Sequence, residues 1–257
     1  LAIARSLASG RKTAVWLGNF AVQHEQAGLI HVLASEVARL AGAKLGVIGE
    51  AANSVGGYLA GAVPFVGDVK GKNVSEMLAS KIKAYLLLGV EPSLDMAAGA
   101  TALSSIREAE MVAVLSPFKS AELMEVADVL LPIAPFTETS GSFVNAQGLI
   151  QSFHAVVRPL GETRPAWKVL RVLADLMGVP GVAFESSQEV LAQVSGGLVS
   201  LSADQLSNAT QAPIVVARGP AEAPVAASIY QLDSLVRRAP ALQLTADARE
   251  AREGAAA

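Results

Sequence analysis

The chain has 257 residues, a formal net charge of −3, 17% charged and 52% hydrophobic residues, and no cysteine. This length suffices for one large α/β domain, or for one domain with a small appendage. A core of that size is expected to fold without disulfide bonds. The composition offers no basic stripe for nucleic acid or anionic lipid, no apolar run near the roughly 20 residues of a bilayer-spanning helix, and no thiolate for zinc or for an iron–sulfur cluster.

The first part of the chain predicts a strand, a helix and a second strand. Thr13–Leu17 is a short β-prone run that ends at Gly18-Asn19, and Gln23–Leu40 carries apolar residues at helical spacing. Lys44–Ile48 is a second short apolar run, closed by Gly49. The Ala- and Gly-rich stretch that follows, Ala51–Ala62, predicts a loop with some helix.

The middle of the chain repeats the alternation of strand and helix. Lys83–Val90 is continuously apolar and predicts a buried strand, with a helix after it at Ala98–Ala109. Met111–Leu115 and Asp128–Ile133 are further β-prone runs, and Ser120–Val126 predicts a short helix between them. Because parallel strands need crossover connections, this order predicts a doubly wound, mostly parallel, Rossmann-like sheet with helices on both faces.

The pattern changes after the last of these strands. Between Phe136 and Gln151, glycine and asparagine punctuate two short β-prone runs, which predicts a hairpin. Pro165 marks the start of a helix that ends at Gly178, and Ala212–Pro224 predicts a strand and a turn. We therefore expect an α/β domain over residues 1–181 and a small C-terminal appendage over residues 182–257.

Loops at the carboxyl ends of parallel strands are the usual ligand sites of such a fold. Here these loops are Gly18-Asn19, Gly49-Glu50, Gly89–Glu91, Ser116–Lys119 and Thr137–Ser140, and we expect them to line one crevice. Two interpretations stand side by side. In one, the glycines admit a phosphate or pterin that Asn19, Glu138 or Asn145 binds. In the other, these residues are present because ordinary turns favour glycine, asparagine and serine without any ligand. The chain has no GxGxxG motif, P-loop or nucleophile elbow, so we predict no catalytic residue.

Other polar residues are predicted to be structural or solvated. His24 and His31 share a predicted helix but are separated by about 10 Å of helical rise, too far for one metal ion without a further ligand. Three pairs of carboxylates occur in polar contexts and are predicted to be solvated: Glu108 with Glu110, Glu122 with Glu125, and Asp247 with Glu250. A cluster of cations could pair with acidic groups of a neighbouring subunit: Arg158, Arg164 and Lys168.

Two stretches carry a resemblance to a known family. Ala127–Pro132, followed by Thr137–Asn145 and Gly148–Gln151, resembles the molybdopterin oxidoreductase family, in which this strand and loop face the pterin cofactor. Pro135–Gly141, read as PFTETSG, and Val157–Trp167, read as VRPLGETRPAW, are similar to the large peripheral-arm subunit of bacterial NADH:quinone oxidoreductase, respiratory complex I. Further similar segments, such as Gly49–Tyr58 and Leu87–Pro92, extend the resemblance along most of the chain.

This resemblance implies a scaffolding region of an iron–sulfur subunit that supports electron transfer from NADH to quinone. It implies no cofactor and no metal in this chain, with Glu138, Asn145 and Gln151 as remnants of a pterin site. The start at Leu1, without a methionine, leads us to expect a piece of a longer protein whose upstream part binds iron–sulfur clusters. The implied partners are other hydrophilic-arm subunits at the cytoplasmic face of the inner membrane, with no direct membrane insertion.

Two alternatives remain open. One is a fragment of a catalytic oxidoreductase of the formate dehydrogenase type, which depends on molybdopterin guanine dinucleotide and contacts it through Glu138, Asn145 and Gln151. The other is a Rossmann-type nucleotide-binding domain, which NAD or FAD would stabilise on binding.

Overall fold

The computed structural model describes residues 2–49, 51–66, 69–96, 99–202, 204–207, 209–210 and 227–255. The chain divides into two compact units. The first comprises Leu1–Ser54, Ala146–Gly148 and Leu201–Ala257, and the second comprises Val55–Asn145 and Leu149–Ser200. The division into a domain at residues 1–181 and an appendage at 182–257 stays a prediction.

The first unit contains the predicted strand, helix and strand. Strand β1 (Ala14–Leu17) pairs in parallel with β2 (Lys44–Val47). Helix α3 (Ala27–Ala41) connects them and packs on both, with Ala34 and Ala38 buried. The helix ends at Gly42, whose φ of 62° is the left-handed conformation that a helix C-cap favours.

The predicted start of this helix at Gln23 is wrong. Asn19–Val22 forms a separate short helix, α2, and a turn precedes α3. In that turn the Nδ1 atom of His24 accepts a hydrogen bond from the backbone N–H of Gln26 at 2.9 Å. A continuous helix needs this N–H for its own ladder, so the imidazole competes with helix formation. His24 therefore lies outside the helix that carries His31.

The other described helices of the first unit are α1 (Ala2–Ser9), α11 (Ile229–Leu232), the 3-10 helix η2 (Val236–Arg238), α12 (Pro240–Gln243) and α13 (Ala246–Ala255). The predicted strand and turn at Ala212–Pro224 lie outside the described residues.

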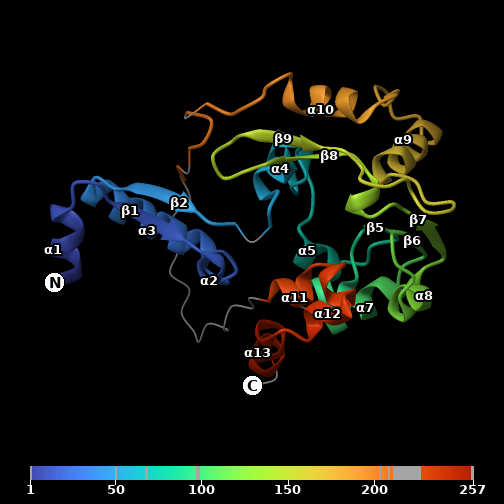
Figure 1. Cartoon of the computed structure of the whole chain (residues 1–257), viewed down its shortest axis with the longest axis horizontal. Helices are drawn as coiled ribbons and strands as arrows, with labels where there is room; N and C mark the ends of the chain where they lie inside the picture. Colours follow the sequence, from blue (N-terminus) through green and yellow to red (C-terminus); the bar gives the residue numbers. More distant parts are fainter. Residues whose placement is uncertain are drawn as a thin grey trace. The chain divides into compact units, whose positions relative to one another are not determined.

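The second unit is built on a parallel sheet of three strands. Its order is β5 (Ala84–Leu88), β6 (Met111–Ser116) and β7 (Val129–Pro132), with Leu86 opposite Ala113 and Ala113 opposite Val129. Helices α7 (Gly99–Arg107) and α8 (Ala121–Val126) form the crossovers between these strands (Figure 1). The core on one face of the sheet consists of Leu87, Ile106, Val112, Val114, Leu123 and Val126.

The prediction that the β5 strand is buried throughout is wrong. Leu87 is 6% exposed, whereas Leu86 is 52% and Leu88 is 43% exposed. Successive side chains of a strand point to opposite faces, so Leu87 joins the core and its two neighbours point to the other face. β5 is also an edge strand of its sheet, which leaves it with one neighbouring strand to cover it.

The remaining elements of the second unit surround this sheet in sequence. They are α4 (Ser54–Leu59), which begins at the boundary between the units, β3 (Phe65–Val66), β4 (Val69–Lys70), α5 (Val74–Leu78), α6 (Pro92–Asp95), the 3-10 helix η1 (Phe136–Glu138), β8 (Gly141–Val144), β9 (Ile150–Phe153), α9 (Ala166–Leu176) and α10 (Ser187–Ser195). The predicted hairpin is confirmed as the antiparallel pair β8 and β9. The helix after Pro165 is confirmed as α9, with Gly178 in the left-handed conformation beyond its end.

These observations confirm the α/β class with parallel sheets. Among the described residues, no helix combines the length and the apolarity needed to cross a bilayer.

Candidate functional site

The carboxyl edge of the β5–β6–β7 sheet brings together three of the predicted loops. Because the strands are parallel, Gly89–Glu91, Ser116–Lys119 and the turn after β7 follow neighbouring strands at the same edge. The first joins this edge through the N–H of Gly89, which donates to the carbonyl of Leu115 at 2.8 Å. The loops Gly18-Asn19 and Gly49 follow β1 and β2 of the first unit, and Glu50 lies outside the described residues. One crevice shared by all five loops stays a prediction.

Acidic side chains at this edge accept hydrogen bonds from nearby backbone N–H groups. Asp95 accepts from the N–H of Glu91 at 2.7 Å. Glu122 accepts from the N–H of Ser93 at 3.0 Å and also from the Ser93 hydroxyl. Each of these donors lies at the start of α6, where N–H groups lack partners within the helix. These carboxylates therefore cap a helix of their own chain.

Ser116 ends β6 and is one of the few buried polar residues, at 6% exposed. Its hydroxyl donates to the carbonyl of Phe118 at 2.8 Å and accepts from the N–H of the same residue at 3.0 Å. The buried hydroxyl of Ser116 thus donates and accepts its hydrogen bonds within its own turn. At Ser116 the structure favours turn chemistry over ligand binding.

Glu138, the first predicted pterin contact, lies in η1 directly after the sheet. Its Oε2 atom accepts a hydrogen bond from the backbone N–H of Leu160 at 3.0 Å. Beside it, the carbonyl of Thr137 accepts from the N–H of Val156 at 2.9 Å. Glu138 and Thr137 thus attach the loop at residues 156–160 to the end of the sheet.

Asn145, the second predicted contact, closes the β8–β9 hairpin. Its Oδ1 atom accepts from the N–H of Leu149 at 3.0 Å, and its own N–H donates to the carbonyl of Leu149 at 3.1 Å. Gly148 completes the turn with a φ of 80°, which a residue with a side chain rarely adopts. The Asn and Gly that suggested a ligand site are thus also the residues that this turn requires.

Gln151, the third predicted contact, lies in β9 opposite Phe143 and is exposed. It shares a face of the hairpin with Phe143 and Phe153, whose rings are 5.3 Å apart in an edge-to-face arrangement. Glu138 precedes the hairpin, whereas Asn145 closes its far end, about 13 Å beyond Gly141 at the usual rise of a strand. Glu138 and Asn145 therefore flank β8 at its two ends, and each side chain is hydrogen-bonded within its own chain.

The remaining candidates are exposed or paired. Glu110 pairs with Lys83 at 3.3 Å, and Glu125 pairs with Arg107 at 2.7 Å. Within the described ranges, no group of three or more His, Cys, Asp or Glu residues has the geometry to hold a metal ion. The cations Arg158, Arg164 and Lys168 are all exposed.

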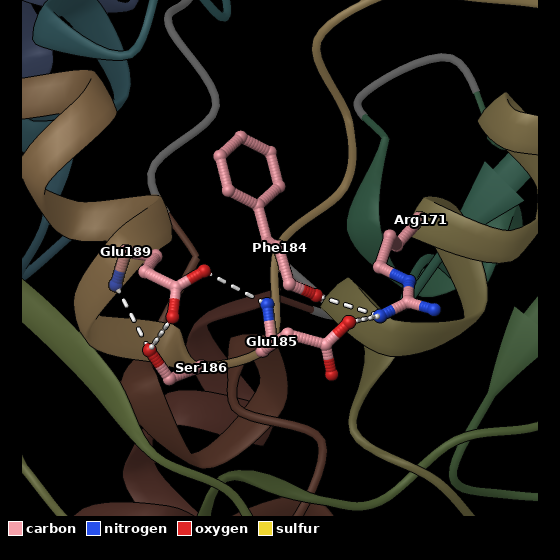
Figure 2. A network of polar contacts seen from close by, with 5 residues as sticks. All are labelled: Arg171, Phe184, Glu185, Ser186 and Glu189. Atoms are coloured by element: carbon pink, nitrogen blue, oxygen red, sulfur yellow. Dashed lines mark hydrogen bonds and ion pairs between the residues drawn. The ribbon is translucent and has the colours of Figure 1, made fainter.

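One polar network was not predicted from the sequence (Figure 2). Arg171 of α9 donates to the carbonyl of Phe184 at 2.7 Å and pairs with Glu185 at 3.2 Å. Glu189 of α10 accepts from the N–H of Glu185 at 2.9 Å, and the Ser186 hydroxyl caps α10 by accepting from the N–H of Glu189. Ser186 and Glu189 have the spacing of a capping box, and this spacing is the feature of the sequence that could have predicted the contact. The network joins α9 to α10 and offers no reacting group.

Comparison with known proteins identifies the class. The family model for molybdopterin oxidoreductases matches residues 2–176, which is more than half of the chain. The chain therefore belongs to the molybdopterin oxidoreductase family. This match confirms the resemblance to the molybdopterin oxidoreductase family.

Individual relatives match over short stretches. A putative formate dehydrogenase of Staphylococcus aureus (strain bovine RF122 / ET3-1) is 40% identical over 52 residues, 20% of this chain and 5% of the relative. A probable oxidoreductase of Bacillus subtilis (strain 168) is 34% identical over 71 residues, 28% of this chain and 7% of the relative. The matches thus span only a small fraction of these longer proteins. Acetylene hydratase from Pelobacter acetylenicus resembles this structure with a TM-score of 0.43 and 18% identity, over 50% of this chain and 19% of that chain.

Proposed function

We propose that this chain is a segment of a larger oxidoreductase of the molybdopterin family, and that it contributes structure to that enzyme rather than reacting groups. The proposal rests on the hydrogen bonds of Glu138 and Asn145, two polar residues in the stretch that resembles the molybdopterin oxidoreductase family. Glu138 binds the N–H of Leu160, and Asn145 binds the N–H of Leu149. Both side chains hold loops of their own chain in place.

A formate dehydrogenase-like enzyme is the parent that the relatives favour, because a putative formate dehydrogenase and a probable oxidoreductase are among them. In such a parent, a molybdenum-bound pterin supplies two-electron redox chemistry. The residues of this chain would stabilise the α/β layer beside that group. Direct contacts from Glu138, Asn145 and Gln151 are not part of this proposal, since Glu138 and Asn145 are hydrogen-bonded within their own chain.

The large peripheral-arm subunit of NADH:quinone oxidoreductase is a second candidate parent, and one observation favours it. The two segments similar to that subunit, PFTETSG and VRPLGETRPAW, are hydrogen-bonded to each other: Glu138 accepts from the N–H of Leu160 at 3.0 Å, and the carbonyl of Thr137 accepts from the N–H of Val157 at 3.5 Å. The two similar segments therefore form one hydrogen-bonded part of the structure. In this case iron–sulfur clusters would lie upstream, the partners would be other hydrophilic-arm subunits, and the complex would lie at the cytoplasmic face of the inner membrane.

The test is purification of the natural-length protein from its host, followed by analysis of metals and pterin and by activity assays. A formate dehydrogenase-like parent predicts molybdenum or tungsten, an extractable pterin and formate-dependent dye reduction. The second parent predicts iron without molybdenum and co-purification with NADH:quinone activity. Absence of both redox activities from an intact preparation would refute the proposed function.

A further inference from the structure

The turn between α2 and α3 is closed by the side chain of a histidine. The Nδ1 atom of His24 accepts a hydrogen bond from the backbone N–H of Gln26 at 2.9 Å, and the ring is half-buried. A ring nitrogen of histidine accepts a hydrogen bond only while it carries no proton, and both ring nitrogens of a protonated imidazole are donors. The contact that closes this turn therefore requires an unprotonated Nδ1 atom.

Protonation of His24 would turn this attraction into repulsion. An N–H group at Nδ1 would face the backbone N–H of Gln26, so that two donors would meet where one hydrogen bond now forms. Gln26 is also the N-cap of α3, and a positive charge is unfavourable near the N-terminus of a helix because the helix dipole is positive there. Both effects weaken the turn when the imidazole gains a proton.

The neighbouring charged groups do not change their charge near neutral pH, with one exception. The sequences of α2 and β1, which pack against each other and against α3, contain no titratable side chain. The turn, α3 and the other elements packed against α3 contribute Glu25, His31, Glu36, Arg39, Arg5 of α1 and Lys44 of β2. Carboxylates, lysine and arginine ordinarily keep their charge between pH 5 and 8, whereas histidine does not. His31 is therefore the neighbour that an experiment must separate from His24.

The turn is joined to one of the loops that follow the strands at their carboxyl ends. α2 is a single helical turn that starts directly after β1, at Gly18-Asn19. The N–H of Gln23 donates to the carbonyl of Asn19 at 2.8 Å, so the last bond of α2 adjoins the turn that His24 closes. The sequence Gln23–Leu40 has the spacing of one continuous helix. The contact of His24 therefore holds this segment against its own helical tendency.

We propose that His24 is a pH-sensitive switch of the segment between β1 and α3. The unprotonated imidazole holds the turn at residues 23–26 closed, and protonation releases it. Release frees α2 and the adjoining loop Gly18-Asn19, which the sequence predicts as a ligand loop. The switch belongs to the first unit and does not depend on the proposed function. Because one hydrogen bond changes a local equilibrium about fivefold, the open population of the turn should rise about fivefold on protonation.

Hydrogen exchange of the natural-length protein, resolved to single amides by mass spectrometry, tests the switch between about pH 8 and about pH 5.5. Each exchange rate is divided by the rate of an unstructured amide at the same pH, because exchange itself depends on pH. The protection of the Gln26 amide should fall about fivefold at the lower pH, whereas the amide of buried Ala38 in α3 should keep its protection. Unchanged or increased protection at Gln26, or an equal loss at Ala38, would overturn the proposal.

Three variants separate His24 from the other histidine of α3. In His24→Asn the Oδ1 atom replaces Nδ1 as an acceptor but does not titrate, so the Gln26 amide should stay protected at both pH values. His24→Ala has no acceptor and should show the low protection of the acid form at both. His31→Asn keeps the His24 contact and should show the same fall as the unchanged protein. A fall in His24→Asn, full protection in His24→Ala, or no fall in His31→Asn would each refute the switch.

Discussion

Removal of the Glu138 carboxylate should release the loop at residues 156–160 without unfolding the sheet. In Glu138→Ala the N–H of Leu160 loses its acceptor at 3.0 Å. A hydrogen bond to a charged group contributes about 1.5–3 kcal/mol, and this carboxylate is half-buried, so we expect about 1 kcal/mol. That free energy corresponds to a roughly fivefold rise in the population of the open loop.

Hydrogen exchange of the Leu160 amide measures this opening directly. The variant should exchange about fivefold faster at this amide, whereas the buried amides of β6 should keep their protection. Glu138→Gln retains an acceptor oxygen and serves as the control, with at most a small change. Unchanged exchange at Leu160 in Glu138→Ala would show that the carboxylate does not hold the loop, and the structural role assigned to Glu138 would be wrong.

Three further substitutions test the core and the hairpin. Leu123→Ala removes a fully buried side chain and should lower the free energy of unfolding by about 2–5 kcal/mol in urea titration, whereas Leu176→Ala, at a 79% exposed position, should change it by at most about 0.5 kcal/mol. Equal effects would contradict the position of the core. Asn145→Ala should destabilise the hairpin by about 1 kcal/mol, because the N–H of Leu149 loses its partner; exchange at that amide checks it, and no acceleration would count against the turn. Gly148→Ala should cost at least about 1 kcal/mol, because φ is 80° and the added Cβ would lie 2.9 Å from Leu201; a neutral result in the same titration would refute this backbone requirement.

The strands and helices were predictable because their signals are local. The apolar run that became β6 and the Pro165 and Gly178 boundaries of α9 each depend on residues within a few positions of one another. The start of α3 was missed because a single contact, from the His24 ring to the N–H of Gln26, interrupts an otherwise helical pattern. Burial of β5 was overestimated because exposure depends on what covers the second face, which hydrophobicity alone does not specify.

The candidate site was harder to predict, because one residue type serves two purposes. Asn145 and Gly148 fit a ligand loop and a tight turn equally well in sequence, and only the hydrogen bonds to Leu149 favour the turn. The partner of Glu138 lies 22 residues away, at Leu160, which no local pattern indicates. Membership of the family followed from motif resemblance, whereas absence of a cofactor from this chain stays a prediction.

The most direct test of the structural role of this chain uses a double variant, Glu138→Gln with Asn145→Asp, in the natural-length enzyme. Both replacements keep an oxygen acceptor for the loop N–H groups but change the charge that a cofactor would meet. The measurement is turnover per assembled enzyme. We predict the same turnover as in the unchanged enzyme, whereas a fall of about tenfold or more at full assembly would show that these side chains serve the reaction itself.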